Sequence, residues 1–205
     1  MHSQPLSEEQ EIGRLLAVAE CLELPRHTFA TALIYRRICA LKNSELDRQT
    51  LGAACLHLAC KQTEVARKLR DIINSVQFVW SGSVLEIDTK FWGIKASVTE
   101  MEMRILRILE FNTVYDLPYT FLALDFESSQ RVAQAAWTWI NDLMLLPPII
   151  DLLVADNRPT AKSLAAAALI FAREGFHPKS QRLPSNACFT LAIDSLLAHK
   201  HSNNH

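Results

Sequence analysis

The feature that most constrains this chain is the run from Thr50 to Glu64, TLGAACLHLACKQTE, in which small and apolar side chains predominate. As an α-helix, this run is apolar or small nearly all round, and such a helix is buried on most sides. Its small side chains also let neighbouring helix backbones approach closely. We therefore predict a central helix around which other helices pack. Lys61 ends the apolar run and places one cation where the buried helix reaches the surface.

The composition favours a mainly helical protein without a strong overall charge. The 205 residues include only five glycines and are 49% hydrophobic, whereas sheet-rich folds usually need more glycine in their turns. Lys and Arg number 21 against 22 Asp and Glu, so no net field attracts nucleic acid or anionic membranes. The length allows one large domain or two of about 100 residues each.

The cysteines and the chain start indicate an intracellular protein. The five cysteines form no C-x-x-C pair and no regular framework, so we interpret them as reduced thiols. The first ten residues lack the apolar segment of a secretory signal, and no uninterrupted apolar run reaches about 18 residues. We therefore expect neither secretion nor membrane insertion. The cysteines are Cys21, Cys39, Cys55, Cys60 and Cys188.

Helical periodicity and capping signals predict the other helices. The first extends from about Ser7 to Glu23, and Pro25 separates it from a second helix that carries Arg36 and Arg37 on its outer side. Asp47 can cap the central helix. Further helices are predicted over Arg67–Val79, from Asp88 for about five turns, and over Gln130–Leu146, Thr160–Arg173 and Cys188–Leu197. Pro147 and Pro148 end the helix over Gln130–Leu146.

A second small-residue helix, Thr160–Arg173, indicates an internal repeat. Residues 53–59 align with residues 166–172 without a gap, although alanine is common enough for a short match to arise without duplication. Residues 112–118 are interpreted as a linker, because proline stops one helix and can start another. We predict an N-terminal domain over residues 1–115 and a C-terminal helical domain over residues 116–205.

No group of residues in the sequence indicates an enzyme. The chain has no glycine-rich phosphate loop, no nucleophile elbow and no histidine pair at metal-binding spacing on a helix. His57 is most simply a packed or edge histidine. Cys55 and Cys60 point to different sides of their helix, which argues against a shared metal. We therefore predict no catalytic residue, no cofactor and no metal.

Lys61 and Glu102 are each a single charge at the edge of an otherwise apolar helix, and we expect the two helices to pack together. The simplest interpretation is an intramolecular salt bridge or a solvated edge, which the residues alone favour. The alternative is a two-point clamp on another protein's main chain. A lysine donates to a carbonyl, a glutamate accepts from an N–H, and apolar neighbours remove water from the contact.

Three runs of sequence, taken in order, resemble the first cyclin box. They are ACLHLACKQTEVARKLRDII, SGSVLEIDTKFW and TEMEMRILRILEFNTVYDLPYTFL. The resemblance covers about Ile12 to Leu122 and is closest to cyclin-Q, a small cyclin-related activator of a cyclin-dependent kinase. It implies an all-α protein of tandem five-helix cyclin folds, the second repeat being short or incomplete, with the two small-residue helices as the central members.

The resemblance also implies a regulatory subunit without catalytic activity of its own. Cyclins bind and activate a cyclin-dependent serine/threonine kinase by packing on its C-helix, which rotates inward so that the kinase's Lys-Glu ion pair forms. Lys61 and Glu102 fall on the family's lysine and glutamate that hold kinase main chain, and Glu64 of the following turn is retained. The positions that line the apolar contact fall on Leu58, Leu106 and Phe111.

The chain also departs from the family's pattern. Gln62 and Thr63 stand where the family usually has an apolar residue and a glutamate, which we expect to retune the kinase contact. Arg36 occupies the site of the acid in the family's Arg-Asp core ion pair, so that pair lacks its acid.

The alternative function is a twin-cyclin-fold adaptor or scaffold in transcription, without kinase activation. The general transcription initiation factor B has the same twin helical fold and binds DNA, which requires a basic face. The nearest candidates, Arg67, Lys68 and Arg70, are too few for strong phosphate affinity. We therefore expect a cyclin-dependent kinase as partner in a heterodimer, no direct nucleic-acid or membrane contact, and a location in the nucleus, the cytoplasm or both.

Overall fold

Helices form all the regular structure in the part of the chain that the computed structural model describes, which is residues 7–43, 45–86, 88–123 and 129–173. The predicted all-α class is confirmed. The helix predicted over Cys188–Leu197 lies outside the described residues. The helices are α1 (Glu8–Cys21), α2 (Arg26–Lys42), α3 (Arg48–Gln62), α4 (Leu69–Ser81), α5 (Thr89–Ile108), α6 (Pro118–Ala123), α7 (Gln130–Leu143), α8 (Pro147–Ala155) and α9 (Asn157–Arg173).

Contacts divide the chain into two compact units. The first comprises Met1–Tyr115 and Met144–Ala155, so it holds α1 to α5 together with α8. The second comprises Asp116–Leu143 and Asp156–His205, and its described helices are α6, α7 and α9. A division of the chain into two domains at residue 115 remains a proposal. Contacts group α8, which follows that residue in the chain, with the first unit.

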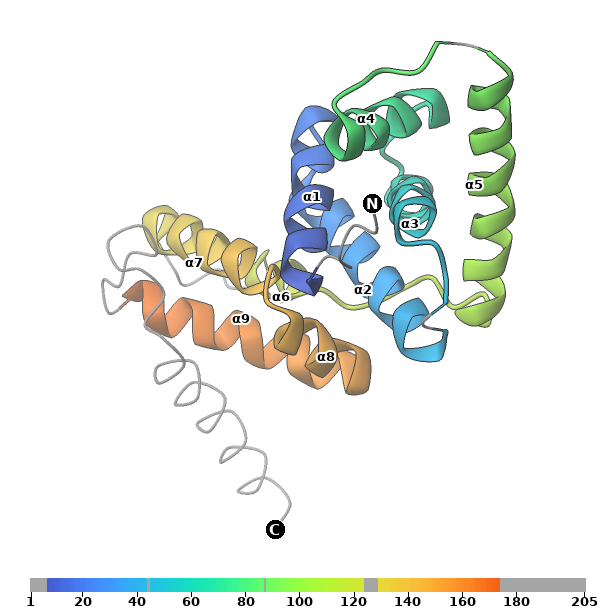
Figure 1. Cartoon of the computed structure of the whole chain (residues 1–205). Helices are drawn as coiled ribbons and strands as arrows, with labels where there is room; N and C mark the ends of the chain where they lie inside the picture. Colours follow the sequence, from blue (N-terminus) through green and yellow to red (C-terminus); the bar gives the residue numbers. More distant parts are fainter. Residues whose placement is uncertain (1–6, 44, 87, 124–128, 174–205) are drawn as a thin grey trace. The chain divides into compact units, whose positions relative to one another are not determined.

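α3 is the central helix of the first unit, as its small residues predict. It packs against α2, α4 and α5, and Figure 1 shows it lying among these helices. Every residue from Leu51 to Cys60 is buried except His57. A Cβ at Gly52 would lie 2.7 Å from Cδ2 of Leu15, so the side chain of α1 uses the space that glycine leaves. The helices α1 to α5 thus form a five-helix arrangement around one buried helix.

Three helices begin at the capping residues that the sequence indicates. The hydroxyl of Ser7 accepts from the Gln10 N–H at 3.3 Å, and the Gln10 side chain accepts in return from the Ser7 N–H. Asp47 caps α3 and Asp88 caps α5 in the same way, each accepting a backbone N–H from three residues further along. These caps fix the residues at which α1, α3 and α5 begin.

The helix α8 was missed by the sequence analysis. Pro147 and Pro148 were interpreted as the end of the preceding helix, but that helix ends at Leu143 and Pro147 begins a new one. Proline suits the first turn of a helix because its missing N–H would have no intrahelical partner there. α8 packs on α2, and its Ile149, Ile150 and Leu153 are buried.

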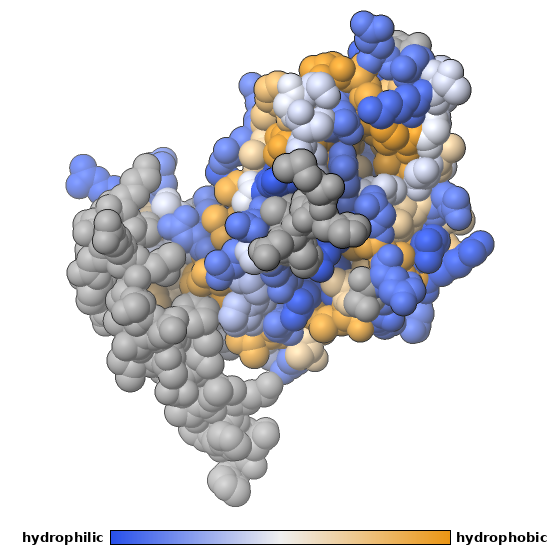
Figure 2. Space-filling model, viewed as in Figure 1, coloured by the Kyte–Doolittle hydropathy of each residue, from blue (hydrophilic) through white to orange (hydrophobic). Residues whose placement is uncertain are grey.

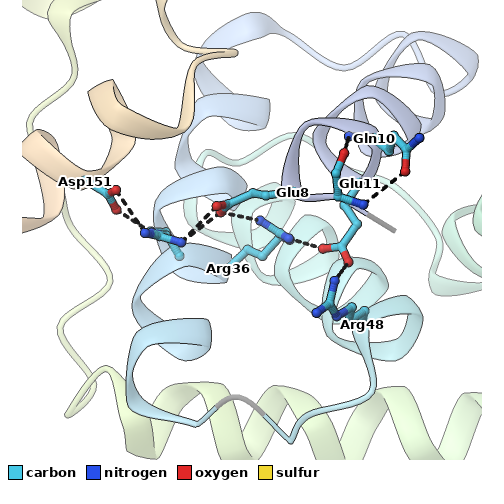
Figure 3. A network of polar contacts seen from close by, with 8 residues as sticks. Glu8, Gln10, Glu11, Arg36, Arg48 and Asp151 are labelled. Carbon is cyan, nitrogen blue, oxygen red and sulfur yellow. Dashed lines mark hydrogen bonds and ion pairs between the residues drawn. The ribbon is translucent and has the colours of Figure 1, made fainter. Parts of the chain in front are cut away.

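A network of charges joins α1, α2, α3 and α8 (Figure 3). Glu11, only 2% exposed, accepts hydrogen bonds from Arg36 and Arg48 through different oxygens. Arg37 donates to both oxygens of Glu8, at 3.0 and 3.1 Å, and pairs with Asp151 of α8 through two nitrogens.

The network corrects two statements made from the sequence. Arg36 is buried at 6% exposure and does not lie on the outer side of its helix. The core ion pair does not lack its acid, because Glu11 of α1 pairs with Arg36. A helical wheel of α2 alone cannot reveal this, since the compensating charge comes from another helix.

The described part of the second unit is smaller than a five-helix cyclin fold. α9 packs on α7 and α6, and Asp116 and Asn157 exchange two hydrogen bonds, at 2.7 and 3.0 Å. α9 differs from α3 in burial: Ala161, Ala165 and Ala168 are buried, whereas Ala166, the counterpart of Ala53 in the sequence alignment, is exposed. Among the described residues, α9 is therefore buried along one face and not all round.

The charge network generates a stability prediction. Glu11→Gln leaves the buried Arg36 with only its 3.5 Å contact to Glu8, and breaking a buried ion pair in this way costs about 3–5 kcal/mol. We expect a loss of that size in the free energy of unfolding, measured by urea denaturation at pH 7. The control is Asp71→Asn, which removes an exposed pair with Arg70 (3.5 Å) and should cost less than about 1 kcal/mol. Equal losses in the two variants would contradict the account of the network.

Candidate functional site

The lysine and the glutamate singled out in the sequence lie against each other at the surface. Lys61, in the last turn of α3, donates to both oxygens of Glu102 on α5, with Nζ at 2.9 Å from Oε2 and 3.1 Å from Oε1. The Glu102 side chain is 8% exposed, whereas the Lys61 side chain is 54% exposed. The intramolecular salt bridge expected from the residues alone is therefore present. The pair is asymmetric, because the acid is buried and the base reaches solvent.

His57 is a third member of this group, which the sequence analysis did not include. It lies one helical turn before Lys61 on α3, and its Nδ1 hydrogen-bonds to Oε1 of Glu102. Its side chain is 13% exposed. The signal that could have found it is the i, i+4 spacing of His57 and Lys61, which puts both on the face of α3 that meets α5.

The charge on Glu102 is stabilised by its two neighbours. Burial on its own would raise the pKa of Glu102, because desolvation disfavours the carboxylate. The hydrogen bonds and charges of His57 and Lys61 outweigh the burial, so the pKa of Glu102 lies below its ordinary value. Glu102 therefore carries a full negative charge at neutral pH in a nearly enclosed position.

The other predicted site residues fall into a buried and an exposed group. Leu58 is buried at 7% exposure and Leu106 is half-buried, so both contribute to the packing of the first unit. Phe111 is 65% exposed and Glu64 is also exposed. An exposed phenylalanine contributes little to the stability of its own chain, and Phe111 and Val114 are the large apolar side chains exposed between α5 and α6.

Glu64 and Phe111 both lie in helix-ending turns with left-handed backbone. After α3, the Val65 N–H bonds to the Cys60 carbonyl at 2.9 Å and Glu64 has φ of 57°. After α5, the Phe111 N–H bonds to the Leu106 carbonyl at 2.8 Å, and Phe111 has φ of 60°. Glycine usually occupies the left-handed position of such turns, so side chains here are held at an energetic cost.

The two residues that depart from the cyclin pattern make contacts within the chain. The Gln62 side chain accepts a hydrogen bond from the Thr113 hydroxyl at 2.8 Å. Thr63 and Thr28 join through their hydroxyls, also at 2.8 Å. These bonds tie the end of α3 to the segment after α5 and to the start of α2. Lys61 and Glu64 are thereby held on a fixed turn.

A hollow of about 220 Å³ adjoins the exposed lysine. Its walls are Cys60, Lys61, Glu64, Val65, Ala66 and Arg67. A smaller hollow, of about 120 Å³, lies toward the other end of α3, where Ile73 and Val76 of α4 face Ile94 and Val98 of α5. Figure 2 shows apolar surface between α4 and α5 on the face that it presents. The first hollow is the one that belongs to the group around Glu102.

Two of the three basic residues weighed for nucleic-acid binding are engaged within the chain. Arg67 donates to the Leu22 carbonyl at 2.9 Å and to the Glu23 carbonyl at 3.4 Å, which caps the end of α1. Arg70 lies 3.5 Å from Asp71. Lys68 remains as an exposed cation of this cluster.

The described residues contain no group of three potential ligands that could hold a metal ion. Their four cysteines are free, and burial raises the pKa of the Cys39 and Cys60 thiols to about 11. Burial also raises the pKa of the Cys55 thiol well above its ordinary value. Within the same residues no single helix is long and apolar enough to span a membrane, although α7 and α8 together meet the criteria of length and composition. Cys188 lies outside the described residues.

Five helices, of which four surround the buried small-residue helix α3, define a cyclin-box type of helical domain. A lysine at the end of α3 pairs with a glutamate of α5. Residues 9–114, just over half of the chain, match the family model described as "Cyclin, N-terminal domain". The chain therefore belongs to the cyclin family. Cyclins are regulatory subunits and not enzymes.

Individual relatives agree with this assignment. Cyclin Pch1 of Schizosaccharomyces pombe is 31% identical over 186 residues, which cover 83% of this chain and 52% of Pch1. Human cyclin-K is 31% identical over 137 residues, covering 59% of this chain and 22% of cyclin-K, and zebrafish (Danio rerio) cyclin-L1 is 28% identical over 143 residues, covering 64% and 29%. The chain spans about half or less of the length of these relatives.

The low pKa of Glu102 predicts a pH-dependent contribution to stability. A carboxylate whose folded pKa is depressed stabilises the fold above its unfolded pKa of about 4.3, and this contribution is lost as the pH falls through the folded pKa. We expect Glu102→Gln to lower the free energy of unfolding by about 1–2 kcal/mol at pH 7. The difference from the native protein should shrink below about pH 4. Urea denaturation between pH 3 and 7 measures it, and a difference independent of pH would contradict the interpretation.

Proposed function

We propose that this chain is the regulatory subunit of a cyclin-dependent serine/threonine kinase. It binds the kinase through the ends of α3 and α5 and activates it by packing on the kinase C-helix. The kinase-contacting residues are Lys61, Glu102, Leu58, Glu64, Leu106 and Phe111. The N-terminal domain, residues 1–115, carries this surface.

The observation that carries the proposal is the asymmetry of the Lys61–Glu102 pair. A buried carboxylate beside a half-exposed lysine presents one acceptor and one mobile donor at the same edge. A carboxylate has about four acceptor sites, of which Lys61 and His57 occupy three, so one remains for an N–H of the partner. Lys61 in turn has N–H donors for a main-chain carbonyl.

The surroundings of the pair fit a desolvated contact. Phe111 and the half-buried Leu106 lie at the end of the same helix as Glu102, and the hollow beside Lys61 can take a side chain of the partner. Apolar contacts that exclude water make a central hydrogen-bonded pair worth far more than it is in solvent. Packing here presses on the kinase C-helix, which must lie inward for the kinase's own Lys-Glu pair to form.

The alternative is a twin-cyclin-fold adaptor or scaffold in transcription that activates no kinase. The observation in its favour is that Gln62 and Thr63 are both occupied by contacts within the chain. DNA binding is the weaker form of this alternative, because Arg67 and Arg70 are engaged within the first unit. A kinase complex with no gain in kinase activity would favour the scaffold, and salt-sensitive binding to duplex DNA would favour the adaptor.

Within the family, we propose that the chain belongs with cyclin-Q and the transcription-type cyclins. The three runs of sequence quoted above carry this assignment, and cyclin-K and cyclin-L1 are among the relatives that match. A location in the nucleus, the cytoplasm or both follows from the same proposal. Affinity capture from a lysate of the native organism, with kinases identified by mass spectrometry, names the partner.

Lys61→Ala tests the clamp with little effect on the fold. Its side chain is 54% exposed, so the free energy of unfolding should fall by less than about 1 kcal/mol. Kinase affinity, measured by calorimetry with the captured kinase, should fall at least about tenfold, as for a residue central to an interface. The matched control is Lys68→Ala, an exposed lysine seven positions away. Equal affinities of the two variants would remove the clamp from the proposal.

Glu64→Gly tests whether the Glu64 carboxylate contacts the kinase, because the substitution should not destabilise the fold. Glycine adopts φ of 57° without strain, so stability should stay the same or rise by up to about 1 kcal/mol. Glu23→Gly is the control, because Glu23 ends α1 in the same kind of turn with φ of 50°. Thermal melts should show the same small change in both, whereas kinase affinity should fall only in Glu64→Gly. If it falls in neither, Glu64 is no part of the contact.

A further inference from the structure

His57 is the member of the Glu102 group that neither the sequence nor the family resemblance assigned a role. It is nearly buried, and Nδ1 hydrogen-bonds to Oε1 of Glu102. An ionised carboxylate only accepts hydrogen bonds, so Nδ1 must be the protonated ring nitrogen in this contact. A neutral imidazole of that tautomer is sufficient.

The three side chains differ in how freely they can move. Lys61 ends in a flexible four-carbon stem and is 54% exposed, whereas the His57 ring is 13% exposed and held between α3 and α5. A partner carbonyl that accepts from Lys61 competes with Glu102 for the lysine's N–H groups. Glu102, at 8% exposure, then needs another donor to remain charged, because an uncompensated buried carboxylate is unfavourable.

We propose that His57 is a positioning residue of the clamp: it holds the Glu102 carboxylate charged and in place while Lys61 turns to the partner's main chain. This inference rests on the proposed function. His57 contacts no partner atom itself and acts through Glu102. His57 faces the charge of Glu102 on α5, and the same carboxylate pairs with Lys61 of the helix that carries His57.

Three substitutions separate the hydrogen bond from the packing of the ring. His57→Asn puts an amide N–H where Nδ1 lies, and His57→Gln puts one nearer to the position of Nε2. His57→Leu fills the space without a donor. If the donor at the Nδ1 position is what matters, Asn should rescue the function and Leu should not, with Gln between them.

The free protein provides the first readout. The pKa of the Glu102 carboxyl, measured by carbon-detected NMR, should rise in His57→Leu because a hydrogen bond that lowers it is lost. It should stay near the native value in His57→Asn. An unchanged pKa in His57→Leu, or equal rises in both variants, would overturn the proposal. If His57→Leu does not fold, a higher pKa in His57→Gln than in His57→Asn supports the proposal and equal values overturn it.

Kinase affinity provides the second readout. We expect His57→Leu to weaken binding of the captured kinase about tenfold and His57→Asn to weaken it less than about threefold. Native affinity in a folded His57→Leu would overturn the positioning role. If the native chain itself binds no kinase, the proposed function fails, while the titration of Glu102 still decides whether His57 holds the carboxylate.

Discussion

The close approach of neighbouring helices to α3 is the constraint on which the first unit depends. Its small residues allow α2, α4 and α5 to pack on one helix, and Gly52 leaves room for Leu15 of α1. This packing brings the C-terminal end of α3 beside the second half of α5. Lys61 therefore lies 2.9 Å from Glu102, although 41 residues separate them in the chain. The candidate site follows from the packing and needs no special loop to form it.

Two buried carboxylates illustrate the same electrostatic principle with different outcomes. Glu11 is enclosed between arginines of α2 and α3, and its charges are satisfied inside the first unit. Each carboxylate has one partner that is 54% exposed, Arg48 for Glu11 and Lys61 for Glu102. Glu11 also pairs with the buried cation Arg36, whereas the second partner of Glu102 is the His57 ring. A buried charge needs compensation wherever it lies. At Glu11 that compensation holds helices together, whereas at Glu102 part of it is available to another molecule. Partner exposure alone does not separate a structural pair from a candidate binding pair, because Arg48 and Lys61 are equally exposed. The buried second cation at Glu11 and the exposed Phe111 after α5 make the difference.

Much of the fold and part of the site could be predicted from sequence, because the signals are local. Capping at Ser7 and Asp47 and the small-residue run predicted the helices correctly, and Lys61 and Glu102 were paired through the expected packing of their helices. The failures required knowledge of distant partners. Arg36 was placed outside because its acid is on α1, and α8 was missed because a proline pair both ends and begins helices. His57 is the exception, because its i, i+4 spacing from Lys61 could have placed it on the same face of α3.

We propose that the ends of α3 and α5 form the kinase-binding surface of this cyclin-family chain. Amide hydrogen exchange of the chain, alone and with the captured kinase, tests it most directly, because it locates the contact without altering any residue. We expect slower exchange on kinase binding in residues 61–66 and 106–113, with smaller changes elsewhere in the first unit. Protection confined to α7 and α9, or to the outer side of α1, would contradict it.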